Sequence, residues 1–275
     1  MNKCFRFMVF FFSSFVLSAN IWALEMDLQK FIAQGQALHE VSDEVQKMTF
    51  FLYDIRKGMA GDQRKLEKKI KMTLWSKKFG EDQHRFLLAA TEPADMAGMA
   101  IRIRQHKDQP NDLWLFHPKE QKMQRLDAGR ADQFLLGTDL RLDDLTDMDP
   151  EKFNYQMLGA ETLEHDGQSF NCLKIQVTLN ADAGARPQRI IWLEEKRLVV
   201  LKVAEKGSNE QLIRTLTFHG YENVKAAAWR PSRILVIHHQ NKHLTLVKIN
   251  SRTINGNLDD SIFEERFILK GRHLK

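Results

Sequence analysis

The stretch "RIIWLEEKRLVVLKV" (Arg189–Val203) decides the fold, because it predicts two neighbouring β-strands with apolar side chains on both faces. Successive side chains of a strand point to opposite faces of a sheet, so a strand with one face in water alternates apolar and polar residues. Here the segments "RIIWL" and "RLVVLKV" are almost continuously apolar, as is "ILVI" (Ile234–Ile237). One face of these strands therefore packs on a core, and the other needs a second cover or an apolar cavity.

Short stretches with a two-residue period continue through most of the chain, for example "KLEKKIKMTLWS" (Lys65–Ser76). Turn residues separate them at nearly even spacing, which predicts ten to twelve strands. Residues 24–47 instead carry a helical apolar stripe, interrupted at Gly35, with a new start or a bent continuation at Ser42. We predict a mainly β (α+β) fold: an open, curled antiparallel sheet, or half-barrel, with helices covering its concave face. Neither a linker nor a repeat divides the chain, so residues 24–275 are expected to form one domain.

The N-terminus has the three regions of a signal peptide. Lys3 and Arg6 precede the apolar run "FMVFFFSSFVL" (Phe7–Leu17), and the segment "SANIWA" then ends at Ala23, a small residue suited to cleavage. The alternative is an uncleaved membrane anchor, but a spanning helix needs about 20 apolar residues and this run is shorter. We expect residues 1–23 to be a signal peptide that is cut near Ala23, which makes this an exported protein.

Charge and cysteine content exclude two classes of protein. The whole chain has a formal net charge of +5 and the segment before Ala23 holds two basic and no acidic residues, so the mature charge is 5 − 2 = +3. This is far from the basic stripe of a nucleic-acid-binding protein, and it is weak support for work at an anionic lipid surface. Cys172 is the single cysteine of the mature chain, and its strand-like setting predicts a buried thiol. No disulfide, within the chain or to a partner, is expected.

The common catalytic motifs are missing from this sequence. It has no G-x-S-x-G elbow, no P-loop and no G-x-G-x-x-G. His238, His239 and His243 are close together, but neighbouring residues of a strand point to opposite faces, which favours a turn over a metal site. We therefore expect no catalytic residues, metal or cofactor.

Five aspartates crowd the stretch "FLLGTDLRLDDLTDMD" (Phe134–Asp149). A calcium loop needs oxygen ligands at alternate positions around a central glycine, and this spacing does not fit. A pair of carboxylates for acid–base catalysis stays open, because its members can come from distant parts of a chain. A structural turn is the interpretation that the spacing favours.

Five short segments occur in an order that is typical of one known family. They are "EPADMAGMAI" (Glu92–Ile101), "DLWLFHPKEQKMQRL" (Asp112–Leu126), "FLLGTDLRLDDL" (Phe134–Leu145), "AAWRPSRILVI" (Ala227–Ile237) and "LDDSIFEERFIL" (Leu258–Leu269). Together they resemble the LolA-like outer membrane lipoprotein-sorting protein family over nearly all of the mature chain. The positions that match its pattern are Pro93, Asp95, Gly98, Trp114, Pro118, Arg125, Gly137, Thr138, Asp139, Asp144, Leu145, Trp229, Pro231 and Phe263.

Two positions depart from the family pattern. Met99 stands where the family usually has threonine, and Leu140 stands where it usually has an aromatic residue. Both changes keep or increase apolar character, so they bear on ligand preference rather than on the fold.

The resemblance implies a half-closed barrel with a helical lid, working as a periplasmic carrier or chaperone for the acyl chains of lipids or lipoproteins. We expect a monomer, with an inner-membrane transporter as a candidate partner. The resemblance also makes the acidic stretch a structural junction: Gly137 permits a bend, and Asp139 and Asp144 accept hydrogen bonds from backbone N–H groups of the turn. Leu136, Leu140 and Leu145 anchor it inward.

The large apolar residues of the predicted strands are the candidates for cavity contacts. They are Trp75, Phe86, Met99, Ile101, Trp114, Phe116, Trp192 and Trp229. Two alternatives to a carrier remain at this point. One is a non-enzymatic protein-interaction module, either an envelope sensor or an accessory subunit of an inner-membrane exporter, and the other is a hydrolase that uses the aspartates.

Overall fold

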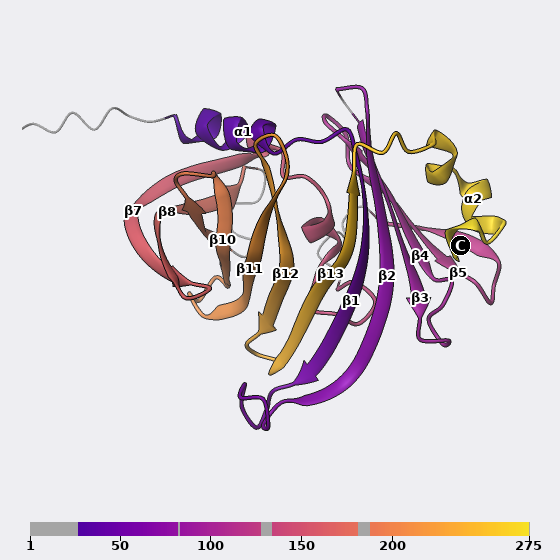
Figure 1. Cartoon of the computed structure of the whole chain (residues 1–275), viewed down its shortest axis with the longest axis horizontal. Coiled ribbons are helices and arrows are strands. Elements are labelled where there is room, and N and C mark those ends of the chain that lie inside the picture. The colour runs from indigo at the N-terminus through magenta and orange to yellow at the C-terminus, as the bar shows by residue number, and fades with distance from the viewer. Residues whose placement is uncertain (1–26, 82, 128–133, 181–187, 275) are drawn as a thin grey trace, which may run out of the picture.

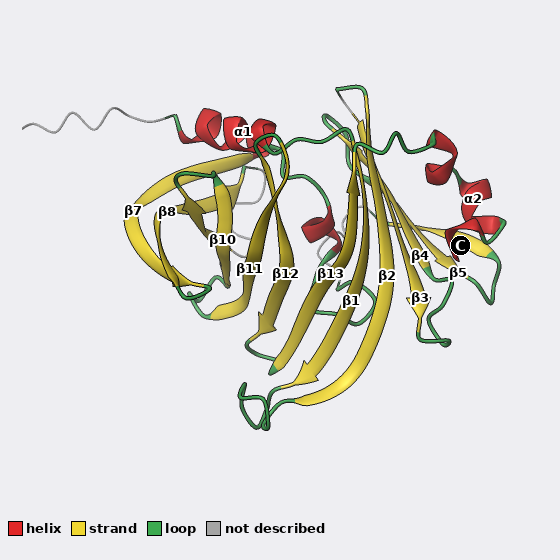
Figure 2. Ribbon diagram, in the orientation of Figure 1, coloured by secondary structure: helices red, strands yellow, loops and turns green. Residues whose placement is uncertain are grey.

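A computed structural model describes residues 27–81, 83–127, 134–180 and 188–274, and within them thirteen strands form one antiparallel sheet (Figure 2). The predicted signal peptide lies outside the described residues. The strands are β1 (Asp43–Asp54), β2 (Lys65–Phe79), β3 (Gln83–Glu92), β4 (Ala100–His106), β5 (Asp112–His117), β6 (Lys122–Leu126), β7 (Phe153–His165), β8 (Gln168–Leu179), β9 (Gln188–Glu194), β10 (Val199–Lys206), β11 (Leu212–Lys225), β12 (Ala228–His238) and β13 (His243–Ile254).

The sheet consists of two meanders that meet at its centre. Its order is β6-β5-β4-β3-β2-β1-β13-β12-β11-β10-β9-β8-β7, so every neighbour is also a neighbour in sequence except for β1 and β13. The sheet curls into an open half-barrel, with β6 and β7 as its edges (Figure 1). The predicted fold class is confirmed.

The main core lies on the concave face, where alternate residues of the central strands meet. Phe50 of β1 pairs in register with Val247 of β13, and both are buried. The chain leaves the sheet at one edge after β6 and re-enters at the other edge with β7, so the acidic connection between them crosses this hollow. Leu135, Leu140 and Leu142 from that connection are buried in the same core.

The two α-helices cover opposite faces of the sheet. Ile32 of α1 (Leu28–Leu38) packs on concave residues such as Ile191 and Leu193 of β9. The other helix, α2 (Glu265–Leu269), packs on the outer face together with Phe263. The expected cover of the concave face is thus provided by α1 and the acidic connection, and α2 packs on the outer face of β3, β4 and β5.

The prediction was wrong for the segment that follows α1. A helical restart or continuation was expected at Ser42, but β1 begins at Asp43, and the sheet has thirteen strands where ten to twelve were expected. Val45 and Met48 fit a helical spacing, but tertiary pairing with two strands overrides that local pattern.

Two of the predicted motif positions shape a turn after β3. The N–H groups of Met96 and Ala97 donate to the carbonyl oxygen of Pro93. Gly98 has φ of +89°, and a Cβ there would lie 3.1 Å from Pro118. A side chain at position 98 would thus meet both backbone strain and a close contact.

No helix in the described part of the chain has the length and apolar character to span a membrane.

Candidate functional site

A pocket of about 690 Å³ opens on the concave side, between α1 and the central strands. Its volume falls within the range of about 300–1,000 Å³ that is usual for small-molecule sites. The pocket lies at the α1 end of the sheet, since it is lined by the start of β1 and the end of β2. The fold therefore provides a cavity on the concave side, with apolar and polar residues in its lining.

The floor of the pocket is apolar and comes from strands of both meanders. Leu74 and Phe86 come from β2 and β3, while Ile191, Leu193 and Phe218 come from β9 and β11. These side chains point into the hollow because each belongs to the concave-facing set of its strand. Such a floor offers contacts to an apolar ligand and few hydrogen bonds.

Helix α1 forms one wall, and polar contacts hold both of its ends. The Asp27 side chain accepts a hydrogen bond from the Lys30 N–H group at 3.1 Å, which caps the first turn. Gly35 faces Leu198 so closely that a Cβ would lie 3.4 Å from the Leu198 Cβ. At the other end, the His39 ring lies 3.2 Å from the Leu198 carbonyl oxygen and accepts from the Trp229 N–H group at 3.3 Å.

A buried carboxylate with two arginines stands at the pocket wall beside α1. Glu44 is 5% exposed, and its oxygens lie 3.1 Å from Arg230 Nε and 2.6 Å from Arg252 Nε. Burial lowers the pKa of Arg252, and Glu44 opposes that change. Arg230 also donates to the His39 carbonyl oxygen at 2.8 Å, which ties the end of α1 to β12. The pocket thus joins an apolar floor to a charged, hydrogen-bonded wall.

The eight cavity candidates separate into three groups in the structure. Phe86 and Trp229 line the pocket. Ile101 and Met99 belong to the concave core. The other four do not line the pocket: Trp75 and Phe116 pack with α2, Trp114 stacks under the Arg102 guanidinium at 4.1 Å, and Trp192 packs with Cys172. Ligand contact by any of the eight stays a prediction.

Sequence reasoning missed most of the residues that line the pocket. Glu44 and Arg230 are 186 positions apart, so no local pattern connects them. Arg230 lies between Trp229 and Pro231, two motif positions that line the pocket, so its neighbourhood was recognised. Its partner Glu44 was assigned to a helix. Ile191 and Leu193 could have been recognised as pocket residues only by knowing which face of β9 is covered by α1.

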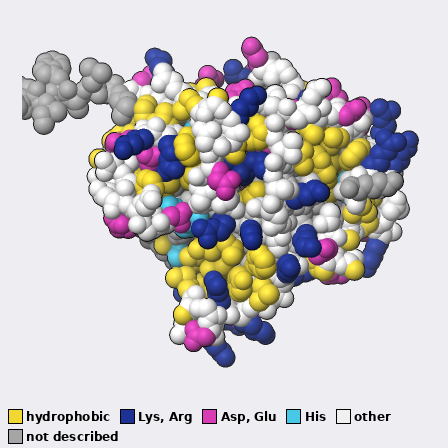
Figure 3. Space-filling view, viewed as in Figure 1, with side chains coloured by type: hydrophobic (Ala, Val, Ile, Leu, Met, Phe, Trp, Pro, Cys, Tyr) yellow, Lys and Arg dark blue, Asp and Glu magenta, His cyan; other side chains and the backbone are white. Residues whose placement is uncertain are grey.

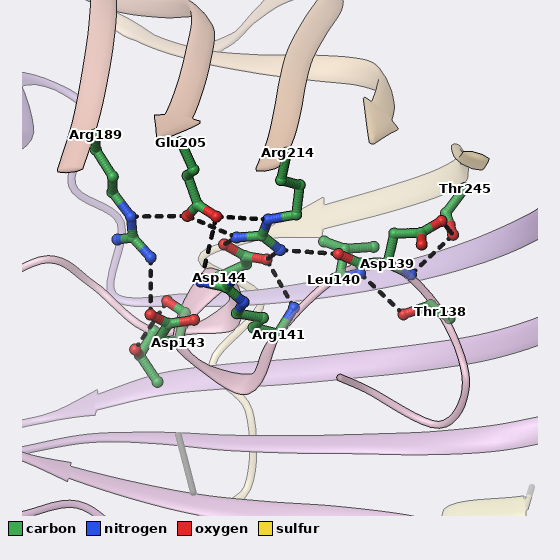
Figure 4. A network of polar contacts seen from close by, with 11 residues as sticks. Thr138, Asp139, Leu140, Arg141, Asp143, Asp144, Arg189, Glu205, Arg214 and Thr245 are labelled. Atoms are coloured by element: carbon green, nitrogen blue, oxygen red, sulfur yellow. Dashed lines mark hydrogen bonds and ion pairs between the residues drawn. The ribbon is translucent and has the colours of Figure 1, made fainter. Parts of the chain in front are cut away.

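The acidic connection is fastened by a buried ion network, shown in Figure 4. Arg214 of β11 lies 2.7 Å from Asp144 and 2.8 Å from Glu205, and Arg189 joins Asp143 at 2.8 Å. Asp144 accepts from the Arg141 N–H group at 2.7 Å, as predicted.

The prediction for Asp139 was different from what the structure shows. Its carboxylate contacts side chains of β13, Thr245 and His243, at 2.7 Å each. The bend at Gly137, with φ of +81°, is confirmed. These contacts make the acidic stretch a junction between the two meanders. Two further acids of the same stretch, Asp147 and Asp149, line the pocket.

This network predicts a loss of stability in acid. Burial raises the pKa of Glu205, but the hydrogen bond and charge of Arg214 outweigh burial and lower that pKa to about 2. A carboxylate with a lowered folded-state pKa stabilises the fold above its unfolded pKa, and that stability disappears as the pH falls from about 4.5 to about 2. We expect a loss on the order of 3 kcal/mol in the free energy of unfolding from this group. Burial raises the pKa of Asp143, which opposes part of this loss.

Urea denaturation at a series of pH values measures the effect. Glu205→Gln should weaken the fall in the free energy of unfolding with decreasing pH. Glu210→Gln, at an exposed position in the turn between β10 and β11, should leave that fall unchanged. Equal acid slopes for the native protein and Glu205→Gln would contradict the assignment.

One group of described residues could hold a metal ion. The ligand atoms of His165, Asp166 and His219 lie within 4.8 Å of one another. The two imidazole rings are stacked at 4.4 Å, and their nitrogens are hydrogen-bonded, for example His219 Nδ1 to Asp166 at 2.7 Å. None of the three residues lines the pocket, and they also form hydrogen bonds with Phe218, Thr217 and Gly220.

A family profile described as "Uncharacterized protein" matches residues 82–270. The chain belongs to this family. A comparison with curated proteins finds no match.

Three solved structures have the same architecture. An outer membrane lipoprotein-sorting protein domain from Vibrio parahaemolyticus has a TM-score of 0.77 at 19% identity, covering 88% of this chain and 97% of that one. A DUF1329 family protein from Desulfovibrio piger gives 0.75 at 17% identity, covering 87% and 97%. A LolA superfamily protein from Nitrosomonas europaea gives 0.63 at 17% identity, covering 87% and 98%. The chain thus has the LolA-type fold that the five segments predicted.

Proposed function

We propose that this protein is a periplasmic carrier that shelters the acyl chains of lipids or lipoproteins in the pocket beneath α1. The observation that supports this most is the 690 Å³ pocket with an apolar floor and a polar wall. An acyl chain gains about 0.8 kcal/mol for each methylene that it buries, so a partly enclosed chain could be held usefully. The hydrogen-bonding groups of a headgroup or an acylated peptide would stay near Glu44 and Arg230.

Several further parts of this proposal come from sequence and fold together. Residues 1–23 would be removed on export, and residues 24–275 would form the carrier domain. The likeness to a structure described as a lipoprotein-sorting domain supports transport between envelope membranes. An inner-membrane transporter would be the donor in such a system. The proposal includes no catalytic step.

The experiment compares lipid uptake by the native protein with uptake by a variant whose pocket is filled. Ser76 lines the pocket on β2, and Ser76→Trp places an indole in the hollow without removing a core side chain. We expect lipids in solvent extracts of the native protein by mass spectrometry. For a fluorescent phospholipid, Ser76→Trp should weaken binding at least about tenfold, which corresponds to about 1.4 kcal/mol.

Ser251→Trp is the matched control, because Ser251 is exposed on the outer face of β13. It should bind lipid as the native protein does, and both variants should keep the native melting temperature. Absence of extracted lipid together with equal uptake by the two variants would reject a carrier pocket. A protein-interaction module would then be the better account, to be tested by recovery of a partner from envelope extracts.

A further inference from the structure

The outer face of the central strands carries two apolar rows, in which Leu244 is buried and the other five side chains are half-buried. In register across β1, β13 and β12, one row is Phe51, Leu246 and Leu235, and the next is Tyr53, Leu244 and Ile237. The residues between them, such as Phe50, face the concave core instead. None of the six belongs to a core cluster of the described residues, and five are half-buried at the surface.

Basic side chains border these rows. Lys69 of β2 lies opposite Phe51, with its Nζ 5.8 Å from the ring, and the Arg64 guanidinium lies 4.9 Å from the Tyr53 ring. Lys248 is exposed on β13 beside the first row. Among the described residues, no carboxylate forms an ion pair with Lys69 or Lys248. Figure 3 shows the resulting surface, an apolar patch with Lys and Arg on its margin.

The hairpin between β1 and β2 extends this surface beyond the sheet, at the end opposite α1 (Figure 1). Met59 at its tip is 57% exposed. Residues 56–71 contain seven lysines and arginines and two acidic residues, a local charge of 7 − 2 = +5, which equals the formal charge of the whole chain. Arg56, Lys68 and Lys71 pair with carboxylates outside this range, Asp54, Asp95 and Glu92, and the other basic residues give this end of the hairpin its positive charge.

We infer that this surface, the two apolar rows and the hairpin tip at residues 55–64, docks on a bilayer that contains anionic lipid. Apolar side chains that enter the headgroup region and basic side chains that reach phosphate groups are the two contributions that hold peripheral proteins on membranes. A bilayer supplies an apolar phase and diffuse negative charge at once, which matches an apolar patch whose margin is mainly basic. The pocket lies at the other end of the sheet, so docking would leave its mouth free.

The inference goes beyond cargo binding and is tested separately with vesicles. The protein is purified after export with its start defined by intact mass, so that all variants share one N-terminus. Flotation is measured with vesicles of phosphatidylcholine alone and with part of it replaced by phosphatidylglycerol. We expect binding to the anionic vesicles only, and its loss near 1 M salt, where the screening length is about 3 Å.

The decisive variant reverses two charges at the tip, Lys57→Glu with Arg64→Glu. Each basic residue near an anionic surface accounts for roughly fivefold in binding, so the double variant should bind at least about twentyfold more weakly. Met59→Asp should also weaken binding. The matched control is Lys119→Glu with Lys122→Glu, two exposed lysines at the turn between β5 and β6.

Uptake of fluorescent phospholipid and the melting temperature should be unchanged in every variant, which separates this inference from the carrier proposal. Equal flotation of tip and control variants would overturn the inference, as would native protein that stays free of anionic vesicles. Retention by an acidic protein without vesicle binding would also overturn it, in favour of a protein partner for the same surface.

Discussion

Replacement of Arg214 by methionine is expected to destabilise the protein by about 3–5 kcal/mol. Arg214 is fully buried, and its guanidinium donates five hydrogen bonds. Two go to Glu205 at 2.8 and 2.9 Å, two to Asp144 at 2.7 and 3.0 Å, and one to the Asp139 carbonyl oxygen at 2.8 Å. Methionine fills similar space but leaves buried carboxylates short of a partner, and uncompensated buried charge is what makes such changes severe. Denaturant titration of the native and variant proteins measures the difference.

Two companion variants separate the cause. Arg214→Lys keeps the charge but loses the planar fork, so it should fall between the native protein and Arg214→Met. Arg125→Ala removes an arginine that is 72% exposed and pairs with Asp112 on the surface, and it should change stability by less than about 1 kcal/mol. If Arg214→Met were no more destabilised than Arg125→Ala, the acidic connection would not depend on this network.

Replacement of Phe263 by alanine is expected to have the second large effect, a loss of about 3–5 kcal/mol. Phe263 is fully buried on the outer face, where its ring meets that of Phe79 edge to face at a centroid distance of 5.7 Å. The cavity left behind would open the contact between the C-terminal segment and β3, where Leu87 and Ala89 are also fully buried. Denaturant titration gives the size of the loss, and amide hydrogen exchange shows whether residues 258–274 open first.

The control for this change comes from the same segment. Leu269 in α2 is 42% exposed, so Leu269→Ala should cost well under the loss seen at Phe263. Phe263→Leu keeps most of the apolar volume and should be intermediate. Unchanged exchange at residues 258–274 in Phe263→Ala would contradict the view that this ring holds the C-terminus on the sheet.

Local patterns predicted most strands well, because a two-residue apolar period describes a pleated surface wherever the strand lies. The exception is β1, which was partly assigned to a helix although it joins the two meanders. Its apolar residues Phe50 and Phe51 are consecutive and face opposite sides, the core and the outer patch, so no alternation marks the strand. The pairing with β13, about 200 positions away, made this segment a strand.

The acidic stretch shows a similar division. Gly137 and the predicted bend could be placed from local chemistry, because only a few residues tolerate a positive φ. The partners of Asp139, Asp143 and Asp144 could not be predicted in this way, since they are on β13, β9 and β11, far away in sequence. Asp143 and Asp144 meet arginines, and Asp139 meets a histidine and a threonine, all far away in sequence.

The expectation of export, the absence of familiar catalytic motifs, the mainly β class and the need for cover on both faces of the sheet all follow from composition and from the spacing of apolar residues, because these are properties of neighbouring residues. Only tertiary structure decided which side chains of each strand face the hollow. It also placed α1 and the acidic connection over that hollow and α2 on the opposite face, and it brought Glu44 to Arg230 at the pocket wall. The physical reason is that a curled sheet brings its two halves together through side chains that are separated by a hundred residues or more, and no local pattern encodes such a meeting.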